Sequence, residues 1–214
     1  DFSAWSLPLL FDVSVYSTGD SRSLDVEAVA DDWRAQPALP AGYPRYAYLI
    51  EGRQAAYLSA LMALKEEGMR AAVTMKPTRI AGHDLASGSV ILRVGQNGDD
   101  LHEAVREAAR RFGLEVLAVD TGLAEWGYPS LGSTEVMPVK TPRIALLAGF
   151  PVHGYSFGWA WYTLDQQYQI PITVRRVRSL AATPIHDFNV LVIPNTFAAE
   201  QLAQQLGEGG VQRL

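Results

Sequence analysis

The sequence of 214 residues contains no cysteine. A disulfide scaffold, a thiol nucleophile and thiolate metal ligands are therefore excluded within this span. The sequence also has no uninterrupted apolar run near the roughly 20 residues that cross a bilayer, so we expect no membrane span. Its hydrophobic fraction of 48% and charged fraction of 19% are typical of a globular protein with a core.

Basic residues are scarce relative to acidic ones. Eighteen Lys plus Arg against 23 Asp plus Glu give a net charge of −5, which disfavours a nucleic-acid partner. The one basic cluster is Arg175, Arg176 and Arg178. In an extended segment Arg176 and Arg178 share a face, and Arg175 takes the other. We interpret the cluster as protection of an exposed edge strand, with an anion site as the alternative.

A zinc site of the carboxypeptidase kind needs His-x-x-Glu and a distant third ligand. The residues three positions after His83, His102, His153 and His186 are Ala86, Val105, Ser156 and Asn189. None is glutamate, so we predict no metal ligand and no cofactor in this span. We expect His102 on a polar, solvated helix face and His83 in a turn-rich loop.

The first half of the chain predicts an α/β domain after an irregular start. Residues 1–45 are rich in proline and turn formers and are expected to be a connecting segment that wraps a neighbour. Residues 46–120 predict a small βαββαβ domain, a split-βαβ, ferredoxin-like layer. The strands of this domain are expected at 46–50, 70–75, 89–94 and 114–119. A local Rossmann-like half is the alternative arrangement.

The second half predicts a parallel sheet. Glycines and prolines mark residues 121–142 as an interdomain linker. Residues 143–214 predict a partial, truncated flavodoxin-like domain, with strands at 144–150, 172–177 and 189–194 in the order 2-1-3. A helix is expected from near Ala198 to Leu206. Gly207, Gly209 and Gly210 are followed by VQRL (211–214), which is expected to be the start of a further helix.

The segment GWAWYTLDQQYQIP, residues 158–171, is rich in aromatic residues and predicts a helix. Four side chains fall at helical spacing and are expected in the core: Phe157, Trp161, Leu164 and Tyr168. Tyr155, Trp159 and Tyr162 lie off that stripe, above the carboxyl end of strand 144–150, where open α/β sheets bind ligands. The candidate binding residues are therefore Tyr155, Ser156 and Trp159, with packing between domains as the alternative for the aromatic rings.

Residues 154–158, GYSFG, match the Gly-x-Ser-x-Gly pattern of a serine nucleophile. Three residues separate this motif from the predicted strand, whereas an elbow serine follows its strand directly. His186 would be the base, with Asp187 or Asp165 as the acid. We interpret Ser156 instead as a helix N-cap and predict no catalytic residue; a serine hydrolase is the third-ranked function.

Four segments together resemble one known arrangement: DFSAWSLPLLFDVSVY, SGSVILRV, PRIALLAG and FNVLVIPN. The chain is similar to the C-terminal region of large bacterial zinc carboxypeptidase-like proteins, the carboxypeptidase A type metallopeptidase family. In these proteins a class I glutamine-amidotransferase-like domain follows the peptidase domain. The resemblance implies that the zinc ligands and the catalytic glutamate lie upstream of Asp1. Amidotransferases of this class use a cysteine beyond the strands seen here, so no catalytic residue carries over.

The resemblance implies a non-catalytic accessory region of an exported metallocarboxypeptidase-like protein, located in the periplasm or outside the cell. Zinc is expected only in the upstream peptidase domain, which is also the expected partner. Trp5, Leu7 and Leu9 lie on one face of a predicted strand and are expected to dock there. The rival function is a binding module that holds a sugar or a peptide against Trp159 and Tyr155.

Overall fold

The structure is a computed structural model that describes residues 15–17, 19, 27, 28, 30, 36–182, 184–197 and 199–211. The predicted docking residues Trp5, Leu7 and Leu9 lie outside the described residues. The chain divides into two units, residues 1–33 and 34–214, and the fold below belongs to the second. It is a mixed α/β structure with an antiparallel five-stranded sheet and a parallel three-stranded sheet. We refer to them as the first sheet and the second sheet.

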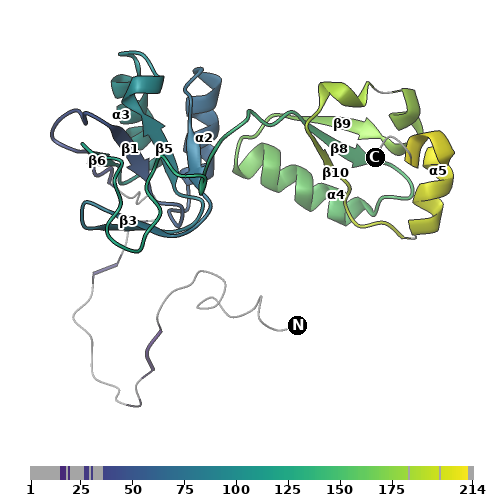
Figure 1. Ribbon diagram of the computed structural model, residues 1–214. Helices are drawn as coiled ribbons and strands as arrows, with labels where there is room; N and C mark the ends of the chain where they lie inside the picture. Colours follow the sequence, from purple (N-terminus) through teal and green to yellow (C-terminus); the bar gives the residue numbers. More distant parts are fainter. Residues whose placement is uncertain are drawn as a thin grey trace. The chain divides into compact units, whose positions relative to one another are not determined.

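The first sheet follows the predicted βαββαβ order along the chain (Figure 1). Its elements are β1 (Ala47–Ile50), α2 (Tyr57–Glu66), β2 (Ala72–Thr74), β5 (Val90–Arg93), α3 (Leu101–Phe112) and β6 (Leu117–Val119). The strands lie in the order β6-β1-β5-β2-β7, and every pair is antiparallel. The antiparallel pairing excludes the Rossmann-like alternative, whose strands are parallel.

Three strands in this half of the chain were not predicted, and two of them form a separate two-stranded sheet. A hairpin of β3 (Thr78–Ile80) and β4 (His83–Leu85) is inserted between β2 and β5. Strand β7 (Val136–Pro138) pairs with β2 and lies inside residues 121–142, which the sequence predicts as a linker. The same segment buries Leu131 completely, so part of it belongs to the core of this sheet.

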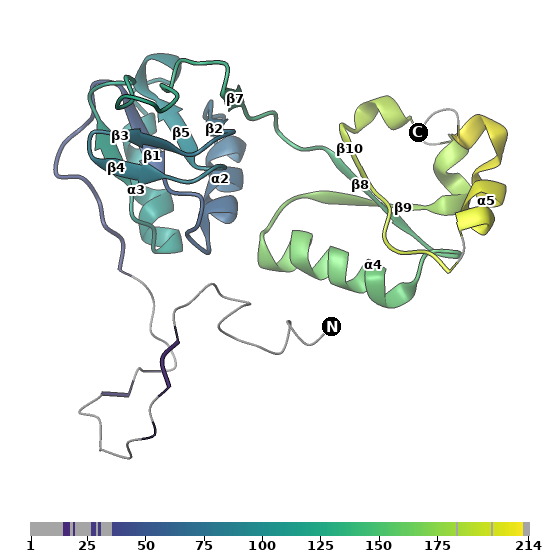
Figure 2. The same ribbon diagram turned by 60° about the horizontal axis from the view of Figure 1, so that its bottom comes forward.

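Every residue of β1 is buried, which shows that both faces of the first sheet are covered. Tyr48 and Ile50 point to the face that α2 and α3 cover, while Ala47 and Leu49 point to the face under the β3–β4 hairpin (Figure 2). Alternate residues of a strand point to opposite faces, so two covered faces require a continuous apolar strand.

Both helices of the first sheet end at a glycine. Gly113 adopts a left-handed conformation (φ 65°) and closes α3. Gly68 does the same after α2 (φ 83°), and the following Met69 N–H bonds back to the Leu64 carbonyl. Glycine is favoured at such positions because it has no Cβ to clash with the helix.

The second sheet has the predicted order, with β8 in the centre and parallel pairing throughout. Its elements are β8 (Ile144–Ala148), α4 (Gly154–Trp161), the π-helix η3 (Tyr162–Gln167), β9 (Ile172–Arg176), the 3₁₀ helices η4 (Val177–Ala182) and η5 (Ile185–Asp187), β10 (Val190–Val192) and α5 (Ala199–Val211). Gly207 has non-helical angles and divides α5 into two helical pieces; the second piece already includes Gly209 and Gly210, which the sequence predicts to precede the further helix. In the described part of the chain, no helix combines the length and apolar character needed to cross a membrane.

Candidate functional site

Helix α4 carries a group of aromatic side chains that face solvent. Tyr155, Trp159 and Tyr162 are spaced by four and three residues, so they share one side of the helix. Their exposed fractions are 80%, 71% and 52%. Together with Trp161 we call them the aromatic surface. They surround a shallow hollow of about 700 Å³.

Gly158 keeps this hollow open. It lines the hollow together with Tyr155 and Trp159, and the place where its Cβ would stand has no heavy atom within 4 Å. A flat molecule or a side chain from another surface therefore finds room beside the rings. Ser156, the third predicted binding residue, does not line this hollow.

The predicted core stripe on this helix is wrong for three of its four residues. Phe157 packs against the buried cluster of the second sheet, but Leu164 and Tyr168 are only partly buried, and Trp161 is 38% exposed. The stripe assumed α-helical spacing throughout, but a π-helix begins at Tyr162, and the Tyr168 N–H bonds to the carbonyl of Thr163, five residues back. A π-helix changes the direction in which later residues point. The spacing of Tyr155, Trp159 and Tyr162, at four and then three residues, was the sequence signal that could have identified the exposed side of the helix.

Ser156 does not have the geometry of a nucleophile elbow. It is the third residue of α4 and stands eight positions after Ala148, the last residue of β8. His186 instead lies 3.5 Å, Nε2 to Oδ1, from the exposed Asp187. Among the described residues no hydrogen bond joins Ser156 to His186. The predicted N-cap role of Ser156 is also wrong, because the N-cap is His153, which has an extended backbone.

The loops that follow β8 and β10 are hydrogen-bonded to each other. The His153 N–H donates to the Asn195 carbonyl (2.8 Å), and the Phe197 N–H donates to the Pro151 carbonyl (3.1 Å). The His153 ring lies between Phe197 and Tyr155, with centroid distances of 4.9 and 5.5 Å. The sequence predicted a pocket at these strand ends against Trp159, but the hollow beside Trp159 has no lining residue from either strand.

The four histidines are dispersed over the described structure. His83 is an exposed residue of β4 rather than of a loop. His102 is not the solvated residue that the helix pattern predicts, because its ring stacks on Tyr43 at 4.1 Å. Among the described residues, no group of three or more His, Asp or Glu side chains is arranged to hold a metal ion.

His102 satisfies a buried hydroxyl of the first sheet. Tyr48 is 1% exposed, and its hydroxyl lies 2.9 Å from the His102 Nδ1. Burial raises the pKa of Tyr48 above its ordinary value of 10.0, because the ionised form would lose its water; nearby Arg106 opposes this shift. The pair stabilises the first sheet, since a buried hydroxyl without a partner is costly.

Comparisons with known protein families, with curated proteins and with solved structures found no match to this chain.

Proposed function

We propose that this chain is an accessory region that binds a neighbouring domain of the same polypeptide through the aromatic surface. The observation that carries the proposal is the exposure of Tyr155, Trp159 and Tyr162 on one side of α4. The neighbour is the zinc peptidase domain of a metallocarboxypeptidase-like protein, as the resemblance implies. The region itself contributes binding and no catalytic group.

The energetics favour a protein partner for such a surface. Buried aromatic side chains cover roughly 150–250 Å² each, so three rings cover on the order of 500 Å². A patch of that size is comparable to the largest apolar patch on a typical monomeric protein, about 300–600 Å², and such patches are often functional. Tryptophan and tyrosine also dominate the binding energy of protein interfaces, because they bring a large rigid area and few rotatable bonds.

The fold supports the proposed family. Three of the segments that carry the resemblance contain strands: SGSVILRV contains β5 and PRIALLAG contains β8, each at the centre of its sheet, and FNVLVIPN contains the edge strand β10. The order β6-β1-β5-β2 is that of a ferredoxin-like layer, and the second sheet has the start of a flavodoxin-like, amidotransferase-like order. We propose both assignments, together with an exported location.

A second candidate is a module that binds a sugar or a peptide. The observation in its favour is the open hollow that Tyr155, Gly158 and Trp159 line, because aromatic rings stack on flat ligands. Both functions use the same surface, so the experiment has to distinguish the two occupants.

The test begins with the reading frame that encodes this chain. It is expected to encode His-x-x-Glu upstream, and the peptidase domain found there is produced separately. We expect it to bind the chain, and we expect Trp159→Ala to weaken binding by at least about tenfold, an effect typical of an interface hot spot. Trp126→Ala is the matched control, because Trp126 is fully exposed in another part of the fold.

Two results would contradict the proposal. One is binding to the peptidase domain that Trp159→Ala does not change. The other is thermal stabilisation of the parent chain by an oligosaccharide or a peptide, lost in Trp159→Ala, with no affinity for the peptidase domain. That second result would establish the binding module instead.

A further inference from the structure

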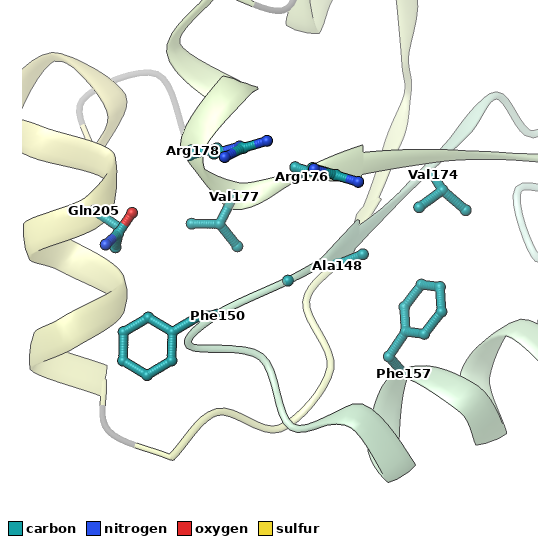
Figure 3. Close-up of a pocket in the computed structure, with 9 residues that line it drawn as sticks. Ala148, Phe150, Phe157, Val174, Arg176, Val177, Arg178 and Gln205 are labelled. Atoms are coloured by element: carbon teal, nitrogen blue, oxygen red, sulfur yellow. The ribbon is translucent and has the colours of Figure 1, made fainter.

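A second hollow lies at the carboxyl ends of β8 and β9, with a volume of about 640 Å³ (Figure 3). Open α/β sheets commonly bind ligands at this end of their strands. The residues that line it are Ala148, Gly149, Phe150, Phe157, Val174, Arg176, Val177, Arg178 and Gln205. None of them is acidic, and two are arginines.

The fold brings the two arginines together. Arg176 is the last residue of β9 and lies on the same face as Val174. The chain then enters η4, where Val177 is buried and Arg178 returns to the same hollow. Figure 3 shows both guanidinium groups on one side of the hollow.

Neither guanidinium is neutralised within the described structure. Arg176 and Arg178 are exposed, and neither guanidinium forms an ion pair or a hydrogen bond with a described residue; the Ser179 hydroxyl donates only to the backbone carbonyl of Arg176. Two neighbouring positive charges repel each other, and an anion between them removes that repulsion. A guanidinium also has a planar set of donors that matches a carboxylate or a phosphate.

The other side of the hollow is apolar. Figure 3 shows the rings of Phe150 and Phe157 opposite the arginines, with Val174 between strand and helix. Phe150 is 62% exposed, so its ring is available for contact. Gln205 of α5 adds one amide group. An apolar pocket with a few converging polar groups is the usual form of a small-molecule site.

Edge protection explains the basic cluster only in part. Strand β9 is an edge strand, as predicted, and charges on it discourage pairing with another chain. Arg178, however, lies beyond the strand. Arg175 points to the other face, where its guanidinium lies 5.5 Å from the centre of the Phe188 ring.

We propose that this hollow binds a small molecule in which a carboxylate or a phosphate is attached to an apolar group. Arg176 and Arg178 hold the anion, and Phe150 and Phe157 contact the apolar part. This site is separate from the aromatic surface, so it does not depend on the proposed docking function.

Calorimetric titration of the chain with two probes tests the site: N-acetylphenylalanine as the carboxylate and phenyl phosphate as the phosphate. At least one is expected to bind, and the stronger one identifies the anion. Neutral N-acetylphenylalanine amide is expected to bind about tenfold more weakly, since it lacks the charge-assisted hydrogen bonds. Inorganic phosphate, which lacks the apolar group, is also expected to bind more weakly.

Variants locate the site. Arg176→Met and Arg178→Met are each expected to weaken binding about tenfold. Arg175→Met on the opposite face is the matched control and is expected to leave affinity unchanged. Trp159→Ala is also expected to have no effect, which keeps this site distinct from the aromatic surface.

The parent chain provides a test that does not depend on how the variants fold. Amide shifts on probe binding are expected around residues 148–150 and 176–178. The proposal is overturned if neither probe binds at millimolar concentration, if the neutral amide binds equally well, if Arg175→Met has the same effect as Arg176→Met, or if the shifts lie on α4 alone.

Discussion

The two sheets of this chain differ in how completely they are covered. In the first sheet, all four residues of β1 are buried, because helices cover one face and a hairpin covers the other. In the second sheet, α4 has no buried residue, and Val174 of β9 and Val190 of β10 are each about 40% exposed (42% and 41%). The first sheet is therefore covered on both faces, whereas the elements of the second sheet leave apolar side chains exposed and available for binding. Both proposed sites lie on the second.

The largest expected effect compares one valine from each sheet. Val90 of β5 is fully buried, and Val174 of β9 is 42% exposed. Val90→Ala is expected to lower the free energy of unfolding by about 2 kcal/mol, because it removes two buried methyl groups and leaves a cavity. Val174→Ala is expected to cost less than about 0.5 kcal/mol. Urea unfolding of both variants measures the difference, and equal losses would break the comparison.

A smaller effect comes from the buried polar groups of the two sheets. Tyr48 has a partner in His102, whereas the buried Nδ1 of His153 has none among the described residues. Tyr48→Phe is expected to cost about 1 kcal/mol, since it removes a hydrogen bond and leaves His102 unsatisfied. His153→Phe is expected to change stability by less than about 0.5 kcal/mol. The same urea titrations measure both; a larger loss in His153→Phe would show that His153 has a partner in solution.

The Tyr48 effect also has a predicted pH dependence. Burial raises the pKa of Tyr48 in the folded state above 10.0, so folding favours the protonated hydroxyl. Its contribution is fully present below pH 10.0 and is lost as the pH rises through the folded-state pKa. The stability difference between the parent and Tyr48→Phe is therefore expected to shrink above pH 10. A difference that stays constant up to pH 12 would contradict the assignment.

Much of this fold could be predicted from local sequence patterns. Three local patterns correspond to observed elements: the continuous apolar run of β8, the helical spacing in 101–112, and the glycines at 68 and 113. Each pattern reflects a requirement of its own segment, namely burial of a strand, burial of one helix face, or a helix end. The order 2-1-3 followed from the handedness of the crossovers. In these places the local preference and the final structure agree.

The missed elements depend on contacts that local patterns do not encode. The β3–β4 hairpin turns at Ala81 and Gly82, both with positive φ, and alanine is an unusual residue for such a turn. Strand β7 is identified only by its pairing with β2. His102 was misjudged because its partners, Tyr43 and Tyr48, are more than 50 positions away.

The candidate sites were predictable only in part. The aromatic residues of α4 stood out in the sequence, but the π-helix that follows them, and changes the direction of Leu164 and later residues, did not. Arg176 and Arg178 were identified as sharing a face, yet the hollow beside them also needs Phe150, Phe157 and Gln205 from three other segments. A pocket assembled from separate elements has no signature in any one of them.

The most direct test of the account is the accessibility of Trp159 in the proposed longer polypeptide, in which a peptidase domain precedes this chain. Variants that keep only Trp159 or only Trp126 within this region are compared by acrylamide quenching, each in the chain of 214 residues and in the longer protein. The account predicts that Trp159 is readily quenched in the chain and several-fold less in the longer protein, while Trp126 is quenched equally in both. Equal quenching of Trp159 in the two proteins would contradict the claim that the aromatic surface docks on the peptidase domain.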